Sequence, residues 1–140
     1  MKKNKISKNW INKQRRDIYV RRSKVEGYRS RAVYKLQEID QKFRIFKNGM
    51  SVIDLGAAPG SWSQYALKNV KNGKIVSIDF KDFEKIGNIH QIKGDFTDDR
   101  YKKEIVDYFG VKVDVVLSDL AVNTTGNKNL DSIYTGELCM

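Results

Sequence analysis

Apolar residues recur at helical spacing between residues 29 and 43. This stripe consists of Ala32, Leu36, Ile39 and Phe43, with Val33 at its edge. Because about 100° separates successive helical residues, these side chains fall on one face and predict an amphipathic helix docked on a core. The apolar pattern upstream is weaker, and it predicts only a shorter helix within residues 9–24.

Beyond residue 50 the pattern changes to short apolar runs separated by helical stretches. The runs predict strands at 51–55, 74–79, 89–92 and 112–118, and the intervening patterns predict helices at 61–70 and about 98–109. Strands that alternate with helices indicate an α/β fold with a parallel, doubly wound sheet. Such sheets bind their ligands at the carboxyl ends of the strands.

The last part of the chain is expected to leave this sheet incomplete. The run at 113–117 is apolar throughout, which is typical of a strand covered on both faces. No further strand is expected after it, so it would form an open sheet edge. Residues 129–140 are expected to begin a helix.

Positive charge is concentrated in the first quarter of the chain. Residues 1–35 contain thirteen Lys and Arg residues and two acidic residues, and this segment accounts for the net charge of +10. Trp10, Tyr19, Tyr28 and Tyr34 lie among these cations, a combination suited to binding RNA phosphates and stacking bases. The alternative is a basic arm that only improves solubility. The cations predicted to contact RNA are Arg15, Arg16, Arg21, Arg22, Arg29 and Arg31.

The remaining composition excludes several classes of protein. The chain has one cysteine, Cys139, and one histidine, His90, so neither an intrachain disulfide nor a zinc cluster is expected, and no metal site is predicted. It contains no apolar run long enough to span a membrane, and no secretory signal is expected. A cytoplasmic protein is expected, with a mitochondrial presequence as the alternative.

The stretch "VIDLGAAPGSWSQYA", residues 52–66, joins a predicted strand to a predicted helix through a glycine-rich turn. The turn lacks both the G-x-G-x-x-G pattern of dinucleotide sites and the Gly-Lys-Ser/Thr of a phosphate loop. It suits a ligand with an amino-acid tail and a nucleoside head, such as S-adenosylmethionine. Asp79 ends the next strand and would accept hydrogen bonds from the ribose hydroxyls, while Asp95 and Phe96 would lie at the adenine end. A plain strand-to-helix turn is the alternative.

Four strings together resemble the FtsJ/RrmJ family of ribose 2′-O-methyltransferases. They are "GYRSRAVYKLQEI" at 27–39, "DLGAAPGSWSQ" at 54–64, "GDF" at 94–96 and "SDLAVNTTG" at 118–126. The resemblance implies a Rossmann-like sheet of about four strands that binds S-adenosylmethionine, preceded by a basic helical segment. It implies cofactor contacts by Gly60, Trp62, Asp79, Asp95 and Asp119.

The resemblance also implies a catalytic set of Lys, Asp, Lys and Glu. Lys35 and Asp119 match its first two members, whereas the second Lys and the Glu would follow Met140. Lys35 as a solvated helix residue and Asp119 as a strand-end cap are the alternatives. The 140 residues alone are therefore expected to bind the cofactor weakly and to be inactive.

These features lead to two hypotheses about function. The first is methylation of a uridine ribose in 23S ribosomal RNA, with the large ribosomal subunit as partner. The second is that the chain is a truncated, non-catalytic protein that binds RNA, S-adenosylmethionine or both. The expected division of the chain is a basic RNA-binding extension over 1–28 and a partial methyltransferase domain over 29–140.

Overall fold

A five-stranded sheet forms the centre of the molecule. The computed structural model describes residues 2–110, 113–119 and 134–135, and its sheet has the order β3-β2-β1-β4-β5. The strands are β1 (Ser51–Leu55), β2 (Lys74–Asp79), β3 (His90–Lys93), β4 (Val115–Ser118) and β5 (Tyr134–Thr135). The first four are parallel, as predicted from the alternation of strands and helices.

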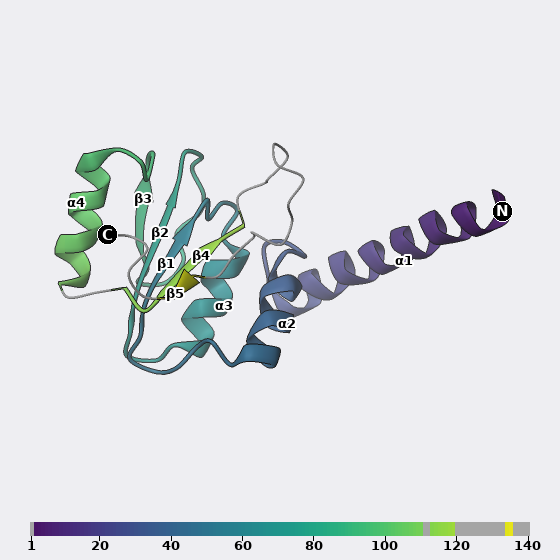
Figure 1. Ribbon diagram of the computed structural model, residues 1–140, viewed down its shortest axis with the longest axis horizontal. Coiled ribbons are helices and arrows are strands. Elements are labelled where there is room, and N and C mark those ends of the chain that lie inside the picture. Colours follow the sequence, from purple (N-terminus) through teal and green to yellow (C-terminus); the bar gives the residue numbers. More distant parts are fainter. Residues whose placement is uncertain (1, 111–112, 120–133, 136–140) are drawn as a thin grey trace.

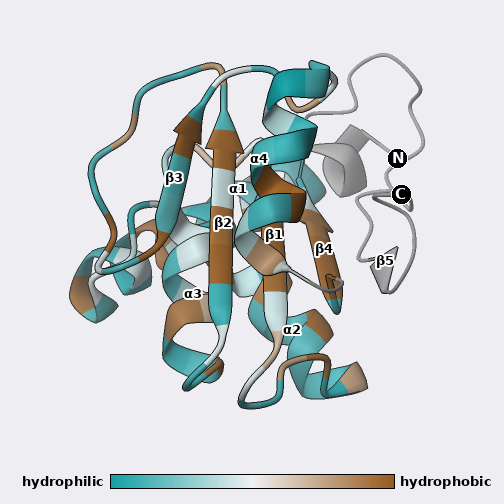
Figure 2. Ribbon diagram, turned by 90° about the vertical axis from the view of Figure 1, so that its left-hand side faces the viewer, coloured by the Kyte–Doolittle hydropathy of each residue, from teal (hydrophilic) through white to brown (hydrophobic). Residues whose placement is uncertain are grey.

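Helices cover both faces of this sheet. α2 (Val33–Phe43) and α3 (Ser61–Asn69) lie on one face, and α4 (Asp99–Phe109) lies on the other (Figure 1). Successive strand residues point to opposite faces, so Val52 packs in the α2/α3 core and Ile53 in the α4 core. Figure 2 shows the resulting hydrophobic character of β1 and β2. Burial on both faces explains why adjacent residues such as Val52 and Ile53 are both apolar.

The N-terminal helix α1 (Lys2–Glu26) extends away from the sheet and its covering helices (Figure 1). It is longer than the helix predicted over 9–24. Its pattern is weak because much of its surface faces solvent, and even Trp10 and Ile18 are exposed. A helix without a continuous buried face leaves little periodic signal in the sequence.

The prediction for residues 29–43 was partly wrong. α2 begins only at Val33, and its buried residues are Val33, Tyr34 and Leu36, all near its beginning, where it packs against α3. Phe43 was expected in the core but is 65% exposed. It is the last residue of the helix, which ends where Arg44 adopts a left-handed conformation (φ 49°).

The prediction that β4 is an open edge was also wrong. β5 pairs with it in antiparallel orientation, with Val116 opposite Tyr134 and Val115 opposite Thr135. The helix expected to begin within 129–140 is contradicted at these two strand residues. The other residues of that range, and the part of the 118–126 string after Asp119, lie outside the described residues.

Candidate active site

The glycine-rich turn between β1 and α3 forms the floor of the candidate site. Two of its glycines have positive φ values, 71° at Gly56 and 117° at Gly60. The backbone N–H groups of Gly56 and Ala57 both donate to the carbonyl oxygen of Ile78, at 2.9 and 3.1 Å. These bonds hold the turn against the carboxyl end of β2.

Gly60 has no room for a side chain. A Cβ atom there would lie 2.6 Å from Cδ1 of Ile86 and 3.0 Å from Nη1 of Arg29. Both neighbours come from segments far away in the sequence. The glycine therefore permits the turn, the 29–32 segment and the loop after β2 to meet at one point.

Asp79 lies at the end of β2 beside this turn, as predicted. Its Oδ2 accepts a hydrogen bond from the backbone N–H of Ala58 at 2.9 Å, and its Oδ1 accepts one from the N–H of Lys81 at 2.9 Å. The carboxylate is thus fixed by one backbone donor on each oxygen. Each oxygen keeps acceptor capacity for a ligand hydroxyl, because a carboxylate offers about four lone-pair sites.

Arg29 clamps the turn to the loop after β2. Its Nη1 donates to the carbonyl oxygens of Pro59 (2.9 Å) and Glu84 (2.6 Å), and its Nη2 donates to that of Lys85 (3.1 Å). Its backbone N–H donates to Oε1 of Gln64 in α3, at 2.9 Å. The predicted RNA contact of Arg29 stays a prediction, and the positioning role of its guanidinium had no signal in the sequence.

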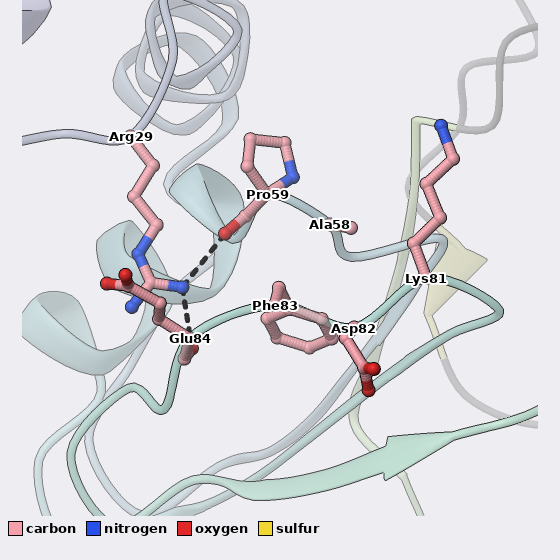
Figure 3. Close-up of a pocket in the computed structure, with 7 residues that line it drawn as sticks. All are labelled: Arg29, Ala58, Pro59, Lys81, Asp82, Phe83 and Glu84. Atoms are coloured by element: carbon pink, nitrogen blue, oxygen red, sulfur yellow. Dashed lines mark hydrogen bonds between the residues drawn. The ribbon is translucent and has the colours of Figure 1, made fainter.

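A cleft of about 530 Å³ opens between the glycine turn and this loop (Figure 3). Its lining residues are Arg29, Ala58, Pro59, Lys81, Asp82, Phe83 and Glu84. Figure 3 shows the Arg29 guanidinium bridging Pro59 and Glu84 at one end of the cleft, with the Phe83 ring between it and Lys81. A volume of this size is typical of pockets for small molecules.

Asp54 is a buried carboxyl group directly before the turn. It is 1% exposed, and its Oδ2 accepts a hydrogen bond from the Ser63 hydroxyl at 2.7 Å. Ser63 also contacts the Ser77 hydroxyl at 2.5 Å. Burial raises the pKa of Asp54 to about 7, the Ser63 hydrogen bond opposes this rise, and the charges of Asp119 and Asp79 add to it. The group therefore changes protonation near neutral pH.

Trp62 is buried between α3 and the segment before α2, whereas Asp95 lies in the loop after β3. Trp62 is 3% exposed, and its indole N–H donates to the carbonyl oxygen of Ala32 at 2.8 Å, which joins α3 to the segment before α2. Asp95 is partly exposed after β3, and its Oδ1 accepts from both the N–H and the hydroxyl of Thr97. These bonds lower the pKa of Asp95. Cofactor contact by either residue stays a prediction.

Lys35 and Asp119 are brought together from α2 and the end of β4. Their Nζ and Oδ1 atoms lie 3.5 Å apart, and their side chains are 42% and 33% exposed. Both line a second cleft of about 570 Å³. The pair therefore combines a cation and a carboxylate at a site that a substrate can reach.

The predicted RNA-contacting cations of α1 and the 29–32 segment differ in their surroundings, and their contacts with RNA stay predictions. Arg15, Arg16 and Arg21 are exposed along α1. Arg22 is instead ion-paired with Glu26 on the same helix, and Arg31 lines the second cleft. α1 therefore carries exposed cations, and the 29–32 segment joins it to α2.

The described part of the chain offers neither a metal cluster nor a helix suited to a membrane. Within residues 2–110, 113–119 and 134–135, no group of three or more His, Cys, Asp or Glu residues could hold a metal ion, and Cys139 lies outside them. No described helix has both the length and the apolar character needed to cross a membrane.

Comparisons with known proteins agree with this geometry. Residues 28–140 match the family described as FtsJ-like methyltransferase. Across its full length the chain is 68% identical to the ribosomal RNA large subunit methyltransferase E of Pelagibacter ubique. The proteins of the same name from Rickettsia akari and Hydrogenovibrio crunogenus are 45% and 43% identical to it, over 95% and 100% of the chain. The chain spans 69%, 61% and 70% of the length of these three relatives.

A solved structure is also similar. It is that of a ribosomal RNA methyltransferase from Plasmodium falciparum, with a TM-score of 0.63 and 38% sequence identity over 74% of this chain and 62% of that one. The predicted α/β methyltransferase fold is confirmed by this likeness and by the family match.

Proposed function

Because the chain belongs to the FtsJ-like methyltransferase family, we propose that it acts in the S-adenosylmethionine-dependent 2′-O-methylation of a uridine ribose in 23S ribosomal RNA, with the large ribosomal subunit as partner. One observation carries the proposal: Lys35 and Asp119, far apart in the sequence, lie 3.5 Å from each other in an accessible cleft. The names of the relatives support ribosomal RNA as substrate.

The residues around the glycine turn fit S-adenosylmethionine. The positive φ at Gly60 and the lack of space for a Cβ atom there leave backbone, rather than a side chain, at this point of the turn. The Asp79 carboxylate is held by two backbone donors and can accept further hydrogen bonds from the two ribose hydroxyls. Asp95 and Phe96 would face the adenine, and Asp119 would lie near the methionine part. When bound, the cofactor supplies a methyl group on a positively charged sulfur.

Lys35 and Asp119 would position the acceptor ribose. A 2′-hydroxyl between them can donate a hydrogen bond to the Asp119 carboxylate and accept one from the Lys35 ammonium. This arrangement would orient the hydroxyl oxygen for methyl transfer, and orientation alone can lower a barrier by several kcal/mol. A bound cofactor would supply the methyl group, its carbon–sulfur bond breaking as the oxygen–carbon bond forms, and the hydroxyl proton would pass to the Asp119 carboxylate or to solvent.

Calorimetry tests the cofactor assignment directly. The chain is expected to bind S-adenosylmethionine, and NAD is expected to bind far more weakly because the turn lacks a pyrophosphate-binding pattern. Equal affinity for NAD would contradict the methyltransferase proposal. This measurement does not depend on turnover.

Tritium transfer from labelled cofactor to large ribosomal subunits tests the reaction itself. In a form of the protein that also carries the second Lys and the Glu of the family set, Lys35→Ala is expected to lower transfer strongly while cofactor affinity stays the same, because Lys35 would face the acceptor. Lys42→Ala, which removes another exposed lysine of α2, is the matched control. Binding of both RNA and cofactor by a chain whose transfer is insensitive to Lys35 would favour the non-catalytic alternative.

A further inference from the structure

Four segments of the chain line the second cleft. Its lining residues are Tyr19, Ser30, Arg31, Ala32, Tyr34, Lys35, Glu38 and Asp119. They belong to α1, the 29–32 segment, α2 and the end of β4. α1 therefore does more than carry charge, since Tyr19 places an aromatic ring in the same cleft as the Lys35–Asp119 pair.

The ring of Tyr19 is held in place from one side. Its centroid lies 5.3 Å from that of Tyr34, with an angle of 31° between the rings. Tyr34 is itself fixed: it is 7% exposed, its hydroxyl donates to Glu26 at 3.2 Å, and the Arg22 guanidinium lies 4.4 Å from its ring centroid. Tyr28 packs edge-on against Tyr34 at 6.3 Å. Tyr19 thus rests on a rigid aromatic support.

The side of the Tyr19 ring that does not pack against Tyr34 is exposed to solvent. The residue is 41% exposed although it packs against Tyr34. An exposed ring on a rigid support is a surface on which a nucleobase can stack, and unpaired bases in RNA are commonly recognised in this way. A ribose held by Lys35 and Asp119 carries its own base within the same cleft.

We propose that Tyr19 is the stacking platform for the base of the acceptor nucleotide, so that the N-terminal helix forms one wall of the acceptor site. The inference rests on the proposed function, because it needs an RNA nucleotide in this cleft. It explains why a helix that otherwise extends into solvent is joined to the body through tyrosines. Recognition by stacking requires the acceptor to be unpaired, so single-stranded RNA is the form that the cleft accepts.

Substitutions at Tyr19 separate stacking from packing. Tyr19→Phe keeps the ring, whereas Tyr19→Leu keeps an apolar side chain against Tyr34 but removes the aromatic face. Binding of a single-stranded RNA of about 12 nucleotides, within the site sizes of single-strand binders, is measured by fluorescence anisotropy with the whole chain. The RNA contains a single uridine. We expect Tyr19→Leu to weaken binding roughly 5- to 100-fold and Tyr19→Phe to change it little.

Trp10→Leu is the matched control on the same helix. Trp10 is 63% exposed, and it does not line the cleft. Far-ultraviolet circular dichroism and thermal unfolding of each variant establish that α1 and the domain remain folded. A loss of RNA affinity in Trp10→Leu as large as that in Tyr19→Leu would show general stacking along α1 and would overturn the assignment.

Photocrosslinking gives a readout that a structural role of Tyr19 would not produce. With 4-thiouridine in place of the single uridine, mass spectrometry is expected to map the crosslink to Tyr19 or its immediate neighbours. Unchanged affinity in Tyr19→Leu, or crosslinks confined to other parts of the chain, would refute the stacking role while leaving the proposed function intact. If the unaltered chain binds neither RNA nor S-adenosylmethionine, the proposed function fails, and this inference fails with it.

Discussion

Substitution of Gly60 by alanine tests the central packing claim of the site. Gly60 has a φ of 117°, a conformation that L residues rarely adopt, at a cost of about 1–3 kcal/mol. The new Cβ would also lie 2.6 Å from Cδ1 of Ile86 and 3.0 Å from Nη1 of Arg29. Ile86 is buried, so its displacement adds an overpacking cost of about 1–3 kcal/mol. We therefore expect Gly60→Ala to lower the free energy of unfolding by about 2–6 kcal/mol.

Gly27→Ala separates the two contributions. Gly27 also has a positive φ, 82°, but no atom lies within 4 Å of the Cβ it would gain. Only the conformational cost applies there, about 1–2 kcal/mol. Urea denaturation of both variants measures the difference. Equal losses of stability would refute the claim that Gly60 is needed for contact with Ile86 and Arg29.

A second substitution identifies the clashing atom. Ile86→Val removes Cδ1, the atom closest to the position that the alanine methyl group would take, and in the unaltered chain this should cost about 0.5–1.5 kcal/mol. Combined with Gly60→Ala it should instead recover part of the lost stability, because the space is then filled by the new methyl group. Additive effects of the two substitutions would mean that the two side chains do not compete for the same space.

Three further predictions concern the cofactor, pH and RNA. Asp79→Ala should weaken S-adenosylmethionine binding by roughly 1–3 kcal/mol, because it removes the proposed ribose acceptor and a support of the turn; unchanged affinity in calorimetry would remove Asp79 from the site. The pKa of Asp54 is about 7 in the folded chain against an ordinary 3.8. Between these two pH values the folded state keeps a proton that the unfolded chain releases, so the free energy of unfolding should fall by ~4 kcal/mol as the pH rises from the lower value to the higher one. Asp54→Asn should flatten that dependence in urea titrations performed at about pH 5 and about pH 8, on either side of the folded pKa, and an equal slope in both proteins would argue against a neutral buried carboxyl group. Reversal of Arg15 and Arg16 to Glu should reduce the salt dependence of RNA binding, whereas the same reversal of Lys102 and Lys103 on α4 should not; identical slopes would make α1 a solubilising arm.

The parallel strands could be predicted because their burial leaves a direct mark on the sequence. β1 and β2 are covered on both faces, so each has adjacent apolar residues, Val52 and Ile53 in β1 and Ile75 and Val76 in β2, and each strand is bounded by a turn. Asp79 and Asp119 could be placed at the site for the same reason, since each lies at the end of a buried strand. Lys35 was identified only through the family resemblance.

Features that depend on the paths of loops could not be predicted. The clamp by Arg29 requires the carbonyl groups of Pro59, Glu84 and Lys85 to converge, and carbonyl directions in a loop leave no pattern of residue types. The exposure of Phe43 depends on where α2 ends, which helical periodicity alone does not fix. The role of Tyr19 depends on how α1 joins the body at Tyr34.

The short segment at 29–32 contributes side chains to both clefts. Arg29 lines the first cleft and Ser30 the second, and the Ser30 hydroxyl lies 2.8 Å from that of Ser61, the first residue after the glycine turn. If the cofactor and RNA occupy these clefts as proposed, a shift of this segment caused by one ligand would couple the two binding events. Thermodynamic linkage then makes the coupling reciprocal: the factor by which cofactor tightens RNA binding must equal the factor by which RNA tightens cofactor binding. Measuring RNA affinity with and without cofactor, and cofactor affinity with and without RNA, should therefore give the same factor.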